Sequence, residues 1–413
     1  MGLPFVVLNM VSAVLFKDLG ISDAQIAFWT SLIMWPWTIK FLWSPFLEIF
    51  RTKKFFVVTT QLLSGILFGL AALSLHLPSF FAVTIAVFAV VAFSGATHDI
   101  AADGVYMSEL TTQDQAKYIG WQGAFYNLAK LVATGGLVWF AGFLYEGFST
   151  SGTASFDAYV RSWTVVLLLL CVTLVALGLY HLRALPSGGS ASEGRSLRDG
   201  LSGLKEVVGA FFQKKHIWYY LGFIILYRLG EGFVMKIVPL FLKADTASGG
   251  LGLTNQQIGL YYGTFGAGAF LLGSLLAGYY IAHRGLRRTL FILCCIFNIP
   301  FAVYALLAWL QPQSMWIVGG GIVLEYFGYG FGFVGLTLFM MQQVAPGRHQ
   351  MAHYAFASGI MNLSVMLTGA VSGYLSDALG YGMFFLAVML ATVPAFLVTW
   401  FVPFTYDDKP NDK

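Results

Sequence analysis

The stretch Thr97-His98-Asp99-Ile100-Ala101-Ala102-Asp103-Gly104 determines how this chain is interpreted. It lies inside an apolar run over residues 80–107, which is long enough to cross a bilayer as a helix. Ionisable side chains are costly in hydrocarbon, so their presence in a span indicates function. Asp99 and Asp103 are four residues apart and share one helix face, which should meet protein or water rather than lipid. The alternative is a helix end near the interface, where both carboxylates are hydrated.

The composition predicts an integral membrane protein. Of the 413 residues 58% are hydrophobic and 10% are charged, and the mean hydropathy is +0.75, whereas a soluble domain carries about 25% charged residues. The net charge of +4 is no evidence for a nucleic-acid partner, because the basic residues lie mostly in short loops. The cysteines Cys171, Cys294 and Cys295 all fall within apolar runs, so we expect neither disulfides nor a metal site. No cleavable signal is visible, and we expect Met1 either to begin at the membrane interface or to follow a few further residues of the natural protein.

Twelve apolar runs predict twelve transmembrane helices, because a helix satisfies its own backbone in lipid. Their extents are 1–16, 24–47, 55–76, 80–107, 118–148, 160–182, 216–242, 256–282, 289–310, 314–341, 350–375 and 380–403.

The distribution of lysine and arginine predicts the orientation. With a cytoplasmic N-terminus, sixteen of the 23 basic residues lie in inner loops and the C-terminal tail, and three lie in outer loops. The remaining four, Lys40, Lys130, Arg228 and Lys236, lie within predicted helices. This asymmetry follows the positive-inside rule, so both termini are expected in the cytoplasm.

One long polar stretch divides the chain. Residues 186–194 are rich in glycine and serine, which is typical of a flexible linker. After it, apolar residues from Leu197 to Phe211 recur at helical spacing among basic residues, which predicts an amphipathic helix on the cytoplasmic membrane surface. The predicted parts are a six-helix bundle over 1–183, a linker over 184–215, a second six-helix bundle over 216–403, and a cytoplasmic tail over 404–413.

Two loops carry weak copies of one pattern. After the second run, Glu48 is followed by Arg51, Lys53 and Lys54, and after the eighth, residues 278–288 keep glycines and arginines. Both resemble the loop motif of the major facilitator superfamily. The resemblance implies an all-α fold of twelve transmembrane helices in a 6+6 arrangement, with the first, fourth, seventh and tenth spans around a central cavity.

Three short blocks carry a closer resemblance. Residues 41–45, 97–104 and 226–231 look like those of AmpG-type permeases, in the peptide/acetyl-coenzyme-A transporter branch of this superfamily. That resemblance implies import of anhydromuropeptides across the bacterial inner membrane for peptidoglycan recycling, driven by the proton gradient. His98 stands where such proteins commonly carry Gln, and Lys130 and Lys236 stand where uncharged residues are expected.

Charged and aromatic residues in the predicted spans are the candidate site residues. Carboxylates that can carry a proton are Asp99, Asp103, Glu231 and Glu325. Candidate solute-binding residues are His98, Lys40, Lys130, Arg228, Lys236, Tyr126, Tyr227, Tyr326, Tyr329 and Trp121, since cations bind carboxylates and rings stack on sugars. The alternative for Arg228 and Glu231, and for Lys40 with a carboxylate, is a fixed ion pair between helices.

Three classes of function remain open. The favoured class is a proton-coupled importer of a saccharide-containing solute, either an anhydromuropeptide or a free di- or oligosaccharide or other amphipathic metabolite. A membrane enzyme is disfavoured because no nucleophile motif and no metal-ligand spacing is found, and an ATP-driven pump because no phosphate-loop lysine follows the glycine runs. A membrane sensor that binds without transporting is the third class. The expected partners are a small solute and the bilayer, with no cofactor beyond the proton gradient, and the protein is expected to be a monomer.

Overall fold

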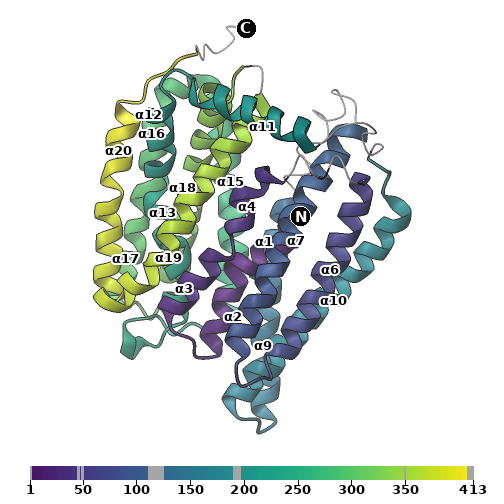
Figure 1. Cartoon of the computed structure of the whole chain (residues 1–413). Coiled ribbons are helices and arrows are strands. Elements are labelled where there is room, and N and C mark those ends of the chain that lie inside the picture. Colours follow the sequence, from purple (N-terminus) through teal and green to yellow (C-terminus); the bar gives the residue numbers. More distant parts are fainter. Residues whose placement is uncertain are drawn as a thin grey trace. The chain divides into compact units, whose positions relative to one another are not determined.

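The computed structural model describes residues 2–43, 47, 51–109, 125–188, 197–347 and 350–406 (Figure 1). Within these residues every regular element is helical, and no strand occurs. Helices suit this composition because each backbone N–H and C=O is paired within its own segment, which hydrocarbon requires. The predicted all-α fold is therefore confirmed.

Within the described ranges, eight continuous helical segments are long and apolar enough to cross a membrane. They are Lys53–Ser74, Phe80–Tyr106, Phe125–Thr150, Ser155–Ala184, Asn255–Arg284, Leu286–Leu310, Met315–Val344 and Phe356–Trp400. The last segment holds two predicted spans. Gly380, with a φ of 72°, breaks the helical geometry inside α19 (Gln350–Ala391) and separates them. The helix α20 (Val393–Trp400) completes the second of the two. These segments therefore account for nine of the twelve expected spans.

The other three expected spans comprise one short helix that contains a π-helical turn and two interrupted helices. The first consists of α1 (Gly2–Val6), the π-helical turn η1 (Val7–Val11) and α2 (Ser12–Asp18). The second is divided between α3 (Asp23–Leu32) and α4 (Trp35–Ile39), which is followed by η2 (Lys40–Leu42). The seventh is divided between α12 (Ile217–Tyr227) and α13 (Leu229–Lys243), which meet at Arg228. Interrupted helices in a membrane protein are expected where the backbone lines a functional region.

The chain forms two compact units, which are residues 1–21 with 32–205, and residues 22–31 with 206–413. In the first, α6 (Lys53–Ser74) packs against α7 (Phe80–Glu109) and α10 (Ser155–Ala184), and α4 packs against α7. The fifth predicted span comprises 125–130, η3 (Leu131–Leu137) and α9 (Val138–Thr150). The predicted boundaries at 183, 215 and 403 stay predictions.

In the second unit, α18 (Met315–Phe339) packs against α15 (Gly266–Arg284) and α16 (Leu286–Asn298), and α13 packs against α19. Short elements complete these spans: α14 (Asn255–Gln257), η5 (Ile258–Phe265), η6 (Ile299–Phe301), α17 (Ala302–Leu310) and η7 (Met340–Val344), while η4 (Thr246–Ser248) lies between spans. The half-helix α3 packs in this unit, where Gly373 of α19 lies directly against the backbone of Asp23 and Ala24.

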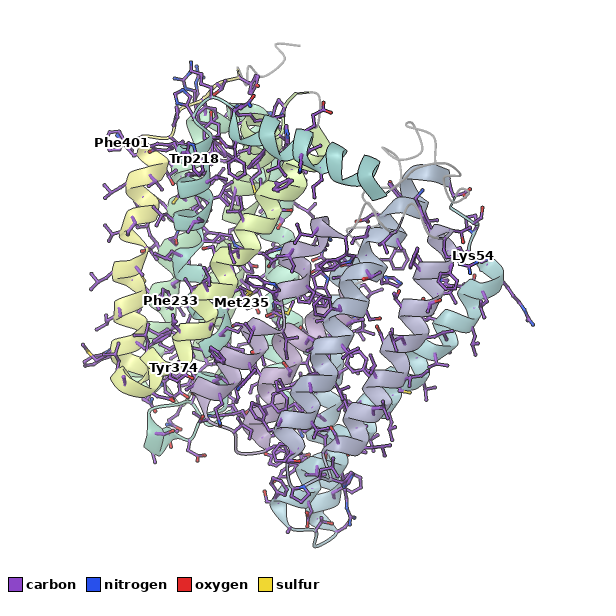
Figure 2. All side chains as sticks on the ribbon, in the orientation of Figure 1. Lys54, Trp218, Phe233, Met235, Tyr374 and Phe401 are labelled. Carbon is purple, nitrogen blue, oxygen red and sulfur yellow. The ribbon has the colours of Figure 1, made fainter. Side chains whose placement is uncertain are left out.

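Large apolar side chains cover the outside of both units (Figure 2). Trp218, Tyr374 and Phe401 are 71%, 56% and 70% exposed, and Figure 2 shows them at the surface. Exposed apolar side chains in this number are incompatible with water as the only solvent. The protein is therefore an integral membrane protein.

The predicted amphipathic helix is present as α11 (Leu197–Phe212), but its C-terminal end packs on protein. Phe211 is fully buried and stacks on Phe356 of α19. Lys214 Nζ, two residues after the helix, donates to the carbonyls of Val344 and Ala345 at 2.7 and 3.1 Å, and burial lowers the pKa of Lys214. The C-terminal end of this helix thus contacts the bundle, because Phe211 has an aromatic partner there. The predicted contact of the helix with the membrane surface stays a prediction.

Candidate functional site

Asp99 is the centre of a polar site in the first unit. It lies in α7, which continues ten residues further to Glu109, so it is not at a helix end. Trp37 Nε1 donates to Asp99 Oδ2 at 2.9 Å. The other oxygen, Oδ1, is buried and has no hydrogen-bond partner among the described residues. One oxygen of this carboxyl group thus accepts a hydrogen bond, and the other oxygen accepts none among the described residues.

The predicted neighbours of Asp99 lie around it. Asp103, one turn further along α7, and Lys40 of η2 both interact electrostatically with Asp99. His98 is half-buried and interacts instead with His181 of α10, whose Nδ1 lies 2.7 Å from Gln61 Oε1. His98 therefore faces a different side of α7 from the carboxylates, as the 100° step between successive helical residues requires.

The other candidates in this unit lie on the fifth span. Lys130 is buried directly before η3, and its carbonyl accepts from Thr134 Oγ1 at 2.9 Å. Tyr126 is 42% exposed and its ring lies against Gly2 of α1. Trp121 lies outside the described residues.

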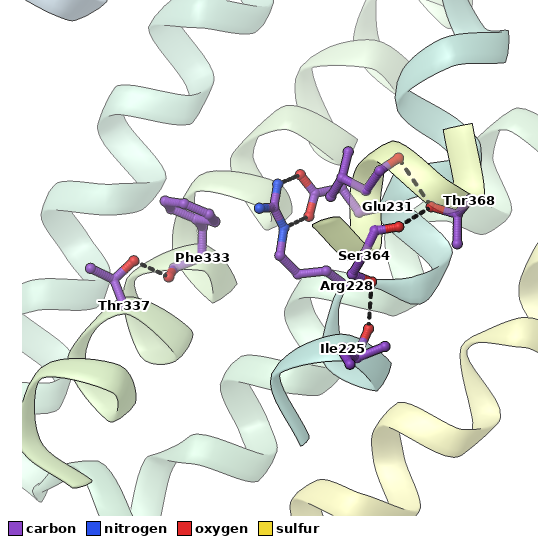
Figure 3. A network of polar contacts seen from close by, with 8 residues as sticks. Ile225, Arg228, Glu231, Phe333, Thr337, Ser364 and Thr368 are labelled. Carbon is purple, nitrogen blue, oxygen red and sulfur yellow. Dashed lines mark hydrogen bonds and ion pairs between the residues drawn. The ribbon is translucent and has the colours of Figure 1, made fainter. Parts of the chain in front are cut away.

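In the second unit, the main polar site is the interruption of the seventh span (Figure 3). Arg228 and Glu231 are 4% and 3% exposed, and the guanidinium donates through Nε and a terminal nitrogen to both carboxylate oxygens. The guanidinium carbon also lies 5.2 Å from the centre of the Phe333 ring. The two residues therefore form the ion pair that the sequence left open as the alternative. The pair is bidentate, which is the strongest geometry for such ions.

The polar residues of α19 stabilise this interruption. Because α12 ends at Tyr227, carbonyls in its last turn lack helical partners. Ser364 Oγ donates to the carbonyl of Ile225 at 2.9 Å, and Thr368 Oγ1 donates to the carbonyl of Ser364 at 2.9 Å (Figure 3). Gly232 lies so close to Thr368 that a Cβ there would overlap the hydroxyl. The break is therefore built into the packing of α13 on α19.

The predicted tyrosines have different environments. Tyr227 is fully buried between Phe223 and Phe297, and its hydroxyl donates to the carbonyl of Gly332 at 2.9 Å. Tyr329 is half-buried and interacts with Arg228. Tyr326 is buried edge-on against Tyr262, with ring centres 5.1 Å apart. Tyr329 is thus the predicted ring that lies next to the ion pair.

Glu325 and Lys236 lie at two further positions in the second unit. Glu325 is buried in α18 and accepts from the hydroxyl of Tyr304 at 2.8 Å. Lys236 passes across Gly369 of α19, and its Nζ donates to Thr30 Oγ1 of α3 at 3.3 Å. A role for either residue in proton or solute binding stays a prediction.

Sequence reasoning did not single out Trp37, Tyr304, Ser364 or Thr368. A signal existed only for Trp37, because it stands beside Trp35 and Pro36 in the middle of an apolar run, away from the interfaces where tryptophan is usual. Within the described ranges, no group of three or more His, Cys, Asp or Glu side chains is arranged to hold a metal ion.

Comparison with known proteins gives the family. The sequence model of the Major Facilitator Superfamily matches residues 1–347 and 224–413. The chain is 24% identical over 375 residues to the anhydromuropeptide permease of Escherichia coli (strain K12), which covers 89% of this chain and 70% of that protein. It is 24% identical over 195 residues to the putative transporter AmpG 2 of Rickettsia bellii, which covers 46% of each. The predicted resemblance to AmpG-type permeases is confirmed.

Solved structures agree on the fold. The crystal structure of a D-xylose-proton symporter superposes with a TM-score of 0.72 at 11% identity, over 97% of this chain and 94% of that one. At this identity the likeness establishes the fold only. The twelve-helix 6+6 arrangement is thereby confirmed, and the chain belongs to the Major Facilitator Superfamily and is a membrane transporter.

Proposed function

We propose that this transporter imports anhydromuropeptide (N-acetylglucosaminyl-anhydromuramoyl-peptide) together with protons across the bacterial inner membrane, for peptidoglycan recycling. It works as a monomer, with both termini in the cytoplasm, with no cofactor, and without enzymatic activity. The observation that carries the proposal is the half-held carboxyl group of Asp99 inside an apolar span. The name of the Escherichia coli relative supports the choice of solute.

Asp99 suits proton transfer because protonation removes the charge that hydrocarbon penalises. Its buried Oδ1 is available to take a proton, and Asp103 lies one turn away on the same helix face. Two charges of one sign at this separation disfavour each other, so a proton on one carboxylate relieves the other. Glu325 is the further proton carrier in the second unit.

The cations and rings of the spans suit an anionic saccharide. Lys40 and Lys130 in the first unit, and Arg228 and Lys236 in the second, supply positive charge within spans. At Arg228, a solute carboxylate has to compete with Glu231 for the guanidinium. Tyr329, beside this pair, and Tyr126 offer ring faces for sugar. A muropeptide carries both carboxylates for the cations and sugar rings for the tyrosines, whereas a neutral disaccharide carries sugar rings only.

The test uses the purified protein in liposomes and in detergent. An imposed inward proton gradient should drive anhydromuropeptide uptake, and calorimetry should show weaker binding at high salt than at low salt, because ions screen charge recognition. A neutral disaccharide that binds as tightly, without salt dependence, would overturn the choice of solute. Solute counterflow without any response to the gradient would remove proton coupling, and binding without counterflow would make the protein a sensor.

A further inference from the structure

Trp37 and Asp99 form a closely fitted contact. Trp37 is 5% exposed and follows Pro36 in the first turn of α4. Its indole lies on α7 at Gly95, where a Cβ would come within 2.7 Å of Cζ2 of the ring. Phe5 of α1 packs edge-on against the same indole, with ring centres 5.2 Å apart. Three elements therefore fix the ring so that Nε1 points at Asp99.

The chemistry of the indole makes the two oxygens of Asp99 unequal. The indole N–H donates and never accepts a hydrogen bond. Asp99 Oδ2 receives this bond at 2.9 Å, so a proton placed on Oδ2 would have to displace it. Oδ1 is buried and accepts no hydrogen bond among the described residues. A proton that reaches this carboxyl group should therefore bind to Oδ1, while Oδ2 becomes the carbonyl oxygen and keeps its donor.

Other charged groups act on Asp99 from the packed elements. Lys40 of η2 is positive, and Asp103 on α7 itself is negative. Lys40 and Asp103 are themselves candidate solute or proton sites. Trp37 carries no charge and makes a directional contact, so it sets the orientation of the carboxyl group rather than its net field.

We propose that Trp37 is a positioning residue that directs proton uptake to Oδ1 of Asp99. The proposal rests on the proposed function, in which Asp99 carries the coupled proton. In the protonated state the Trp37 bond to the carbonyl oxygen is retained, so the carboxyl group does not rotate between the two states. Trp37 thereby keeps one oxygen facing the same proton path throughout the cycle.

Infrared spectroscopy of the full-length protein tests this directly. The carboxylic C=O stretching band of Asp99 is assigned by its loss in Asp99→Asn and followed against pH. Trp37→Phe replaces the indole by a smaller aromatic ring without a donor, so the band should move to higher frequency. The pH of half-protonation should rise by roughly one unit, because a bond to the charged form is lost. Trp43→Phe is the matched control, since Trp43 Nε1 donates to Thr97 Oγ1 of the same helix at 3.2 Å.

A second variant keeps the test decisive if Trp37→Phe does not fold. Gly95→Ala retains the indole but forces it away from α7, so it should shift the same band in the same direction, by less. Gly136→Ala is its control, because a Cβ at Gly136 meets no atom within 4 Å. An unchanged band and midpoint in Trp37→Phe, or in Gly95→Ala alone where the first variant is unfolded, would overturn the positioning role.

The outcomes separate this inference from the proposed function. If the wild-type protein shows gradient-driven uptake but the frequency of the Asp99 band is unchanged in Trp37→Phe, the positioning role fails and the proposed function stands. If the band shifts as expected but the wild-type protein never responds to a proton gradient, proton coupling fails while the contact between Trp37 and Asp99 is established.

Discussion

The buried carboxylates of the two polar sites differ in how many of their oxygens accept hydrogen bonds. In the second unit, both oxygens of Glu231 accept bonds from Arg228, and the guanidinium has an aromatic ring on its face. In the first unit, Asp99 has one oxygen bound by a neutral indole and one oxygen with no partner among the described residues. One carboxylate is fully compensated, and the other is only half compensated.

This difference indicates different tasks. An intact buried ion pair adds little net stability, because the cost of desolvation offsets the attraction, but loss of one member is strongly destabilising. A half-compensated carboxylate contributes little to stability and is ready to change its protonation state. Stability should therefore depend mainly on Arg228 and Glu231, and proton-driven transport mainly on Asp99 and Asp103.

The largest effect should come from neutralising the acidic face of α7. Asp99→Asn and Asp103→Asn should each reduce proton-driven uptake in proteoliposomes to background, because an amide binds no proton at neutral pH. Thermal unfolding of both variants should stay within a few degrees of the wild type, since asparagine keeps the size of the side chain and can still accept the hydrogen bond that Trp37 donates to Asp99. Normal gradient-driven uptake by both variants would contradict the assignment of proton-driven transport to Asp99 and Asp103.

The next effect should be on stability, at the interruption of the seventh span. Arg228→Met or Glu231→Gln alone should lower the free energy of unfolding by about 3–5 kcal/mol, because each leaves a buried charge without its partner. The double variant should lose less than either single variant. Denaturant or thermal unfolding in detergent measures all three.

Two other results would be informative for these two single variants and the double variant. Equal losses in the single and double variants would argue against the pair as a structural unit. If Arg228→Met instead leaves stability unchanged and weakens solute binding, the guanidinium is a solute-binding group. Glu231 then pairs with it only in the absence of solute.

The sequence predicted the residues of both sites but not their partners. Asp99 and Asp103 stand out because charge within an apolar run is costly, and Arg228 and Glu231 are three apart, a spacing that brings side chains together on any helix. The contact of Trp37 with Asp99 joins residues 62 positions apart, and Ser364 reaches Ile225 over 139 positions. Such contacts depend on the packing of helices, which local periodicity does not specify.

The fold was predictable in the number of its spans and less so in their continuity. Apolar length identifies a span whether or not its helix is broken. The breaks depend on local features, such as Pro36 after Trp35 and the dihedral angles of Arg228, with φ of −100° and ψ of 7°. Proline is visible in the sequence, but an arginine at a helix break is not, because its conformation is stabilised by Glu231 and by packing on α19 rather than by its own preference.

The smallest expected effect tests how tightly the fully compensated site is built. Gly232→Ala places a Cβ against Thr368, with Thr368 Cβ and Val365 Cα both at 3.1 Å, so it should lower the free energy of unfolding by about 1–3 kcal/mol through overpacking. Gly222→Ala in the same span is the control, because a Cβ there meets nothing within 4 Å, and it should stabilise by up to about 1 kcal/mol since alanine favours a helix. Thr368→Ala should partly restore the Gly232→Ala variant by removing the hydroxyl. If both glycine variants have the same stability, α13 and α19 have room to separate, and Arg228 and Glu231 are held by their charges alone.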